Sequence, residues 1–222
     1  MSNVLVIAPH PDDEILGVGG TMIRATEKGD NVYVCIVTKG MQPMFSAESV
    51  KQVRDEAVSC HEFIGVKKTF WLDFPASMLE KADRAELNGK LLEVIKETCP
   101  DEVYLPHWGD MQKDHQIVTE SAMVALRPKY LPHIKKIYAY ETLSETGWNV
   151  PNIQNEFIPT VYVDITKHID KKLEAMNIYK SQVGVFPETR SVRAVESLAR
   201  YRGCMMNLEA AEAFTLIREI YE

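Results

Sequence analysis

The sequence predicts an α/β protein with a Rossmann-like, mainly parallel sheet and helices on both faces, folded as a single domain over residues 1–222. Short apolar runs rich in β-branched residues alternate with segments whose apolar residues recur at helical spacing. The chain has 222 residues, 45% hydrophobic and 26% charged, which fits one globular domain with a substantial core. Alternating strands and helices favour βαβ units and a parallel sheet covered on both sides.

Five strands are expected in a core that covers about residues 1–140: Val4–Ala8, Asn31–Thr38, Thr69–Leu72, Glu102–Leu105 and Lys136–Tyr140. The segments between them predict four helices: Ile15–Lys28, Ala47–Ile64, Lys81–Thr98 and His115–Arg127. In such a sheet, functional residues collect at the carboxyl ends of the strands. The loops that follow the strands are therefore the first places to search.

The last third, about residues 141–222, is less regular and is expected to elaborate this core. Its predicted elements are a strand at Tyr162–Ile165, a helix at Lys167–Lys180, a loop at Val183–Arg190 and a closing helix at Leu208–Tyr221. Pro128 and Pro132 are expected to end the helical pattern before the fifth strand.

Charge and hydropathy exclude several classes of protein. The net charge of -7 and the absence of a Lys/Arg-rich block argue against a nucleic-acid partner. The first apolar run is too short for a signal peptide, and no stretch approaches the ~18 apolar residues of a membrane span. The four cysteines are widely scattered, which favours buried free thiols over disulfides. We therefore expect a cytoplasmic protein.

A dense group of ionisable residues follows the first strand, in the segment Ala8-Pro9-His10-Pro11-Asp12-Asp13-Glu14. Capping of the next helix would explain one acid, because a carboxylate accepts backbone N–H groups there. It does not explain three acids and a histidine in five residues, since like charges repel. The two prolines stiffen the loop by fixing φ. The pattern favours a metal site over capping.

The glycines that follow, Gly17, Gly19 and Gly20, invite a dinucleotide-binding interpretation and hence an oxidoreductase. Their spacing does not match G-x-G-x-x-G, and they lie beyond the strand–helix turn. The acids would also repel a pyrophosphate at the helix N-terminus. We expect these glycines to let the helix pack closely on the sheet.

A second polar cluster follows the fourth strand, in the segment Leu105-Pro106-His107-Trp108-Gly109-Asp110-Met111-Gln112-Lys113-Asp114-His115. Taken alone, His115 would be interpreted as a capping or solvated residue. In a parallel sheet, however, both clusters lie at the same edge. A catalytic zinc site commonly takes two ligands from a short spacer and a third from far away, as His10, Asp13 and His115 would supply. Iron, cobalt or manganese also accept such ligands.

At these residues the sequence resembles the LmbE-like family, also called the PIG-L family of de-N-acetylases. Pro9 to Glu14 match the family signature, and Asp114-His115 match the end of its second motif. Weaker similarities lie at Arg54–Ala57, Tyr140-Glu141, Tyr179–Gln182, Arg202-Gly203 and Ala211–Phe214. The resemblance implies a Rossmann-like fold and a Zn²⁺-dependent removal of an N-acetyl group.

The resemblance also implies roles for individual residues. His10, Asp13 and His115 would ligate zinc, and Asp12 would act as general base, a distinction between the two aspartates that the residues alone do not make. Arg54 would lie near the substrate or the oxyanion, although a surface ion pair explains it equally well on spacing. Glu14 would support the site through hydrogen bonds.

Gln112 is a departure from the family pattern, which has a histidine three residues before the zinc histidine. That histidine is thought to stabilise the oxyanion and protonate the leaving amine, with the residue at Asp114 orienting it. Glutamine can donate an N–H to an oxyanion but cannot transfer a proton at neutral pH. Either Asp12 returns its own proton, or His107 substitutes, or activity is reduced.

The expected partner is a small N-acetylated sugar or sugar conjugate, and family members often form homo-oligomers. Residues that could contact such a ligand, each also explained by packing or surface roles, are Trp108, Met111, Trp148, Phe186, Tyr140, Glu141 and the late arginines Arg190, Arg193, Arg200 and Arg202. A non-catalytic sugar- or metal-binding protein is the alternative that Gln112 raises.

Overall fold

One mixed sheet organises the computed structural model, which describes residues 1–131 and 133–221. Within these residues its strand order is β3-β2-β1-β4-β5-β7-β6. The strands are β1 (Asn3–Ala8), β2 (Asn31–Lys39), β3 (Lys68–Pro75), β4 (Glu102–Pro106), β5 (Lys136–Tyr140), β6 (Val161–Asp164) and β7 (Ala211–Glu219). The first five are parallel, and β7 is antiparallel to both β5 and β6. The predicted α/β class with a mainly parallel sheet is confirmed.

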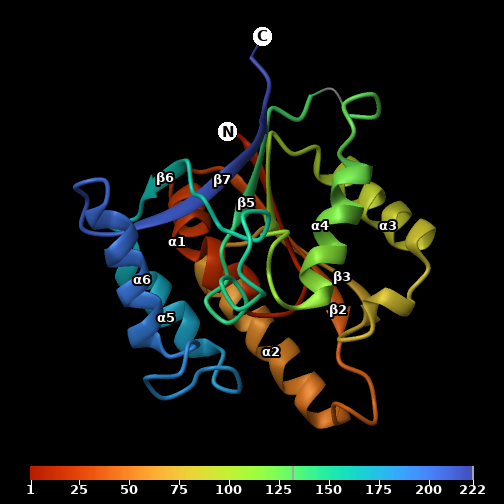
Figure 1. The fold of residues 1–222 in the computed structure, drawn as a ribbon, viewed down its shortest axis with the longest axis horizontal. Coiled ribbons are helices and arrows are strands. Elements are labelled where there is room, and N and C mark those ends of the chain that lie inside the picture. Colours follow the sequence, from red (N-terminus) through yellow and green to blue (C-terminus); the bar gives the residue numbers. More distant parts are fainter. Residues whose placement is uncertain (132, 222) are drawn as a thin grey trace.

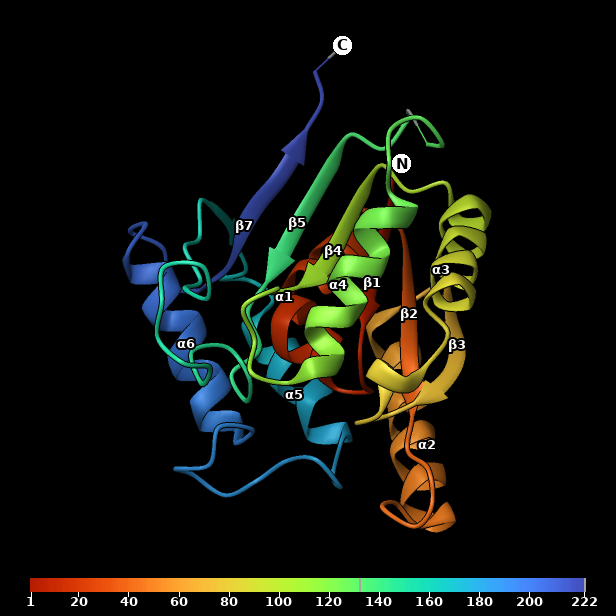
Figure 2. The same cartoon turned by 45° about the vertical axis from the view of Figure 1, so that its right-hand side comes forward.

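Helices cover both faces of this sheet, as Figures 1 and 2 show. They are α1 (Asp13–Glu27), α2 (Ala47–Ile64), α3 (Arg84–Thr98), α4 (Lys113–Ala125), α5 (Ile169–Ile178) and α6 (Val192–Cys204), with a short 3-10 helix, η1 (Leu79–Lys81). On β1, Val4 and Val6 point into the core beneath α1, α2 and α5, whereas Leu5 and Ile7 point into the core beneath α3 and α4. This alternation explains why β1 is an unbroken apolar run.

Local sequence fixes several helix ends. Ser46, Asp83 and Ser191 each accept a backbone N–H of the first turn, at the starts of α2, α3 and α6. Gly65 ends α2 in the left-handed region, with φ of 82°. The helices that start at the two polar clusters differ: α1 and α4 have no side-chain cap. The acids at the starts of α1 and α4 are therefore not used as helix caps.

The last third departs from the prediction in two places. The expected closing helix at Leu208–Tyr221 is wrong, because residues 211–219 form β7 between β5 and β6. Its Leu, Glu and Ala residues favour a helix locally, but pairing on both sides supplies hydrogen bonds along the strand. The helix α6 was not predicted. The predicted loop at Val183–Arg190 is confirmed, and the prediction for Pro132 falls outside the described residues.

A buried ion pair fixes β7 against α1. The Glu212 carboxylate accepts the backbone N–H groups of Gly20 and Thr21, each at 2.7 Å, and pairs with Lys172 Nζ at 2.6 Å. Lys172 Nζ also donates to the carbonyl of Leu16. Because both charges have hydrogen-bond partners, their burial is tolerated. The pair ties the C-terminal strand to the helix that carries Asp13.

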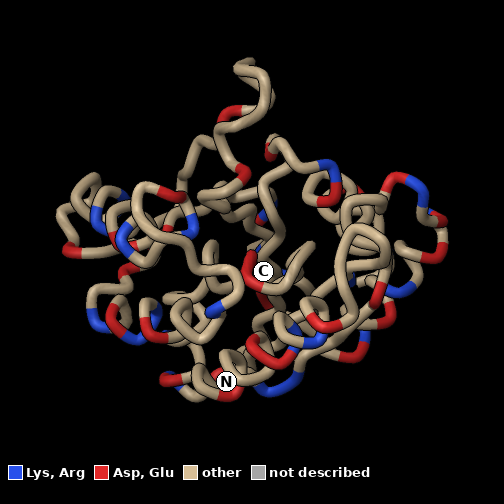
Figure 3. The backbone as a smooth tube through the Cα atoms, turned by 90° about the horizontal axis from the view of Figure 1, so that it is seen from below, with Lys and Arg blue, Asp and Glu red and all other residues tan. Residues whose placement is uncertain are grey.

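Other expectations concern the surface and the thiols. Lys and Arg are interspersed with Asp and Glu along the chain, with no extended basic stretch in this view (Figure 3). No helix among the described residues is long and apolar enough to cross a bilayer.

All four cysteines are free, but only Cys35 and Cys60 are buried, whereas Cys99 and Cys204 are exposed.

The glycines of α1 allow close packing, as expected. A Cβ on Gly17 would lie 2.3 Å from the ring of Tyr140 and 3.0 Å from the carbonyl oxygen of Glu141. Gly20 meets Ile165 in the same way, at 2.8 Å. The helix therefore approaches the end of β5 more closely than a side chain would permit.

We predict that Gly17→Ala lowers the free energy of unfolding by about 1–3 kcal/mol, because the methyl group forces backbone or ring to move. Gly89→Ala is the matched control, since Gly89 lies within α3 and an added Cβ there would point into open space. It should raise stability by about 0.5–1 kcal/mol. Urea unfolding measures both, and equal effects would contradict the packing.

Candidate active site

The two polar clusters meet where the strand order reverses. β1 lies between β2 and β4, and their connections leave toward opposite faces of the sheet, so a crevice opens at the carboxyl ends of β1 and β4. His10 and Asp12 lie between β1 and α1, and Asp13 is the first residue of α1. Gln112, Asp114 and His115 lie at the start of α4. Residues about a hundred positions apart thus share one site.

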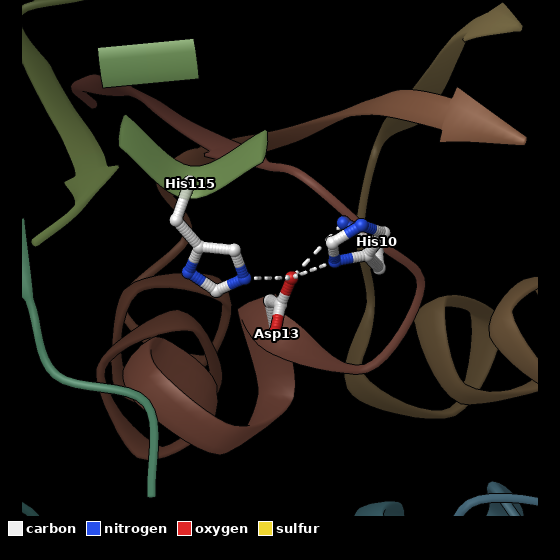
Figure 4. A group of neighbouring side chains, drawn as sticks. All are labelled: His10, Asp13 and His115. Carbon is white, nitrogen blue, oxygen red and sulfur yellow. Dashed lines mark hydrogen bonds and ion pairs between the residues drawn. The ribbon is translucent and has the colours of Figure 1, made fainter. Parts of the chain in front are cut away.

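His10, Asp13 and His115 form the centre of this site (Figure 4). Asp13 Oδ2 is 3.1 Å from His10 Nδ1 and 3.2 Å from His115 Nε2. One ligand atom from each of the three side chains lies within 4.8 Å of the other two. Asp13 and His115 are buried, and His10 is 18% exposed at its side chain. The structure therefore assembles the predicted trio.

Each imidazole is oriented by a carboxylate on its outer side. His10 Nε2 is 3.0 Å from Asp114 Oδ2, and His115 Nδ1 is 2.9 Å from Asp110 Oδ2. A ring that donates its outer N–H to a carboxylate presents the lone pair of its inner nitrogen, which is the form that binds a metal. Among the described residues, the inner His115 Nε2 and Asp13 Oδ1 are buried without a hydrogen-bond partner. The donor set therefore fits a divalent cation such as zinc.

Asp110 was missed by the sequence analysis. It is fully buried, and its second oxygen accepts the hydroxyl of Thr146 at 2.6 Å. A single acid in a polar loop carries no local signal of such a role, apart from its position five residues before His115. Asp114, which the resemblance assigns to orienting residue 112, instead accepts N–H groups of Ser77 and Leu79 besides contacting His10.

The carboxylates make the space between the two rings attractive to positive charge. Burial by itself lowers the pKa of His10, but hydrogen bonds with Asp114 and Asp13 outweigh it and raise the pKa to about 9. Burial likewise opposes the charge on His115, yet the nearby Asp13 and Asp110 raise its pKa to about 10. Although burial disfavours the Asp13 carboxylate, His115 and His10 hold its pKa well below its usual value.

Asp12 lies beside this centre and is 1% exposed. Its burial, followed by the charge of Asp13, raises its pKa to about 8, while Arg190 opposes the shift. Arg190 Nε is 3.2 Å from Asp12 Oδ2, an ion pair without hydrogen-bond geometry, so that oxygen has no donor among the described residues. Asp12 makes no capping bond to α1. The capping interpretation therefore fails for this residue, and its carboxylate remains able to accept a proton.

A cavity of about 320 Å³ opens onto His10 and Asp12. Gln112 lines it, and the Oε1 atom of this side chain is buried without a partner among the described residues. Arg54 lies on another wall, where it pairs with Asp73 at 3.0 Å and stacks 4.3 Å from the centre of the Trp71 ring. Arg54 therefore forms an ion pair and also borders the cavity.

Several residues suggested by sequence do not border this cavity. Glu141 forms two hydrogen bonds with Arg202, at 2.8 and 2.6 Å, and the hydroxyl of Tyr140 donates to the carbonyl of Ile7. His107 is buried with Nε2 on the carbonyl of Asn155, and it does not line the cavity. The suggested apolar residues are at least two-fifths exposed outside the cavity: Trp108, Met111, Trp148 and Phe186. Trp71 and Phe45 line it instead.

Of the late arginines, Arg190 alone lines this cavity. Arg193 stacks on Phe186, and Arg200 pairs with Glu196 on the surface of α6. Arg190 instead lies at the cavity, with its Nε atom 3.2 Å from Asp12 Oδ2. Its loop folds back over Asp12, a long-range contact that no local pattern predicts.

We predict that Asp110→Asn weakens zinc binding about 10- to 100-fold, because His115 loses the carboxylate that orients it. Asp73→Asn is the matched control, since Asp73 borders the cavity but contacts Arg54 instead of the three central side chains. Competition with a fluorescent chelator measures both affinities. Equal affinities for the two variants would show that Asp110 does not support the centre.

The chain is similar to known proteins in sequence and in fold. Residues 5–126, more than half of the chain, match the PIG-L family, described as GlcNAc-PI de-N-acetylase. The diacetylchitobiose deacetylase of Thermococcus kodakarensis is 26% identical, across 100% of this chain and 85% of its own. A conserved protein of Thermus thermophilus superposes with a TM-score of 0.79 and 27% identity, covering 100% of this chain and 97% of the other.

The fold alone does not define a reaction. The 4-carboxy-2-hydroxymuconate hydratase GalB of Pseudomonas putida has a TM-score of 0.77 at 21% identity, covering 100% of this chain and 98% of that one. Its likeness shows the architecture only. The matched residues 5–126, by contrast, include both clusters of the site. The chain is a member of the PIG-L, or LmbE-like, family.

Proposed function

We propose that this chain is a zinc-dependent hydrolase that removes the N-acetyl group from an N-acetylglucosamine-type sugar or conjugate. The observation that carries the proposal is the trio His10, Asp13 and His115, with both outer ring nitrogens on carboxylates and Asp12 alongside. Family membership and the diacetylchitobiose deacetylase relative support the reaction and the class of substrate. They do not favour the non-catalytic alternative.

His10, Asp13 and His115 would hold the ion. When bound, zinc supplies Lewis-acid polarisation of the amide carbonyl and lowers the pKa of water to about 7. The imidazoles would shed the protons that they carry in its absence, because a metal ligand must offer a free lone pair. The charge of the ion would also lower the pKa of Asp12, which brings this carboxylate into its proton-accepting form.

Asp12 would then take the proton of the attacking water. The Oδ2 atom of Asp12 lacks a hydrogen-bond donor among the described residues. The Arg190 guanidinium lies on one side of this atom and leaves the other side to the water. The Gln112 amide would donate an N–H to the oxygen that gains charge as the tetrahedral centre forms.

The leaving amine needs a proton that Gln112 cannot supply. Since His107 is bonded to Asn155 away from the cavity, Asp12 is the group that would return the proton it accepted. The carboxylate would thus act first as base and then as acid, and acetate and the free amine would leave. Arg54 and Trp71 offer a charged group and an aromatic surface to the sugar side of the cavity.

We predict that Asp12→Asn keeps one zinc per chain but lowers kcat by about 10²–10⁴-fold, because an amide cannot accept the proton. Asp13→Ala should lose both zinc and turnover. Elemental analysis and acetate release from N-acetylglucosamine, diacetylchitobiose and N-acetylglucosaminyl conjugates measure the two properties.

Two results would contradict the proposal. Full activity of Asp12→Asn would remove Asp12 from the reaction. Zinc-loaded wild-type protein that releases no acetate from any member of that panel would overturn the deacetylase function.

A further inference from the structure

The backbone of Asp12 is strained. Its φ of 115° and ψ of -25° lie in a region that residues with a Cβ rarely adopt. Asp12 immediately precedes α1 and contributes a side chain to the cavity. A conformation of this kind persists only where the surrounding structure enforces it. Specific contacts must therefore hold Asp12 in place.

The nearby residue Glu14 makes the decisive contact. Its Oε2 atom accepts the backbone N–H of Asp12 at 3.1 Å. Glu14 is fully buried, so its carboxylate needs further hydrogen bonds to remain there. Its Oε1 atom receives them from the hydroxyl of Tyr179 and from His61 Nε2, the latter at 3.2 Å.

Both donors are themselves fixed. His61 lies in α2, and its Nδ1 is 2.8 Å from the hydroxyl oxygen of Thr69 in β3, an arrangement that leaves Nε2–H to donate to Glu14. Tyr179 follows α5 and is fully buried. Burial, and then the Glu14 carboxylate, raise the pKa of Tyr179 well above its usual value, so its hydroxyl keeps the proton that it donates.

The segment that carries Tyr179 is anchored independently. Two residues later, the N–H of Ser181 lies 3.1 Å from Glu56 Oε1 in α2, and the Ser181 hydroxyl also donates to this carboxylate. Gln182, the next residue, lines the cavity. Segments from α2 and from the last third of the chain therefore converge on Glu14.

We propose that Glu14, His61 and Tyr179 are positioning residues that hold the strained Asp12 backbone and so aim the general base into the cavity. The inference rests on the proposed function for its kinetic test but not for its structural one. None of the three side chains lines the cavity, so they act through Asp12 without contacting the substrate.

The test compares Tyr179→Phe with Tyr104→Phe. Tyr104 is also buried, but its hydroxyl donates to Glu102 at the amino end of β4, the end opposite the site. We expect Tyr179→Phe to lower kcat about tenfold or more, a part of the ~10²–10⁴-fold that a general base contributes. KM and zinc content should remain those of the wild type. Tyr104→Phe should leave kcat unchanged.

A double variant separates positioning from stability. If Tyr179 acts through Asp12, adding Tyr179→Phe to Asp12→Asn should cause no further loss of kcat. His61→Gln keeps an N–H donor and should retain more activity than His61→Leu, which removes it. Wild-type kcat in Tyr179→Phe at equal zinc content, even with a lower Tm, would overturn the inference.

Crystal structures of the same two tyrosine variants give a result that does not depend on turnover. Asp12 should leave the positive-φ region in Tyr179→Phe and keep it in Tyr104→Phe. An unchanged Asp12 in Tyr179→Phe would refute the positioning role. Failure of the wild type to release acetate, with this backbone change still observed, would reject the proposed function alone.

Discussion

The site depends on the burial of negative charge at one edge of the sheet. Five nearly or fully buried acids, Asp12, Asp13, Glu14, Asp110 and Asp114, lie in the two loops that follow β1 and β4 and in the first turns of the next helices. Buried carboxylates are costly unless each has a partner, and a group of them needs positive charge nearby. Hydrogen bonds provide partners for the Glu14 carboxylate and orient the imidazoles. A cation between the two rings would balance the remaining negative charge. In the proposed function, metal binding and the local fold would therefore depend on each other.

The last third of the chain completes this arrangement. Arg190 brings a positive charge to Asp12, and Tyr179 brings a hydroxyl to Glu14 across 165 positions of sequence. The buried pair of Lys172 and Glu212 fastens β7 to α1, the helix whose first residue is Asp13. The early part of the chain supplies the proposed metal ligands. The late part contacts Asp12 and Glu14 beside them and adds Gln182 and Arg190 to the cavity wall.

Sequence predicted the part of this arrangement that local pattern encodes. Short strands between amphipathic helices placed both polar loops at one edge, which was enough to bring Asp13 and His115 together. The local sequence pattern did not reveal β7, because pairing with two neighbouring strands overrides the helix propensity of residues 208–213. Asp110 was not singled out, and Arg190 was named only as one of four late arginines, for a related reason. Each is placed at the site by a partner that only the tertiary structure brings near.

Anomalous diffraction at the zinc edge from crystals of the purified protein measures the cation directly. We expect a single peak bonded at about 2.0–2.2 Å to a nitrogen of His10, an oxygen of Asp13 and a nitrogen of His115. Asp114 and Asp110 should still contact the outer nitrogens of the two rings. A zinc-saturated crystal with no peak at this position, or with these three side chains turned away from one another, would contradict the metal centre on which the proposed hydrolysis depends.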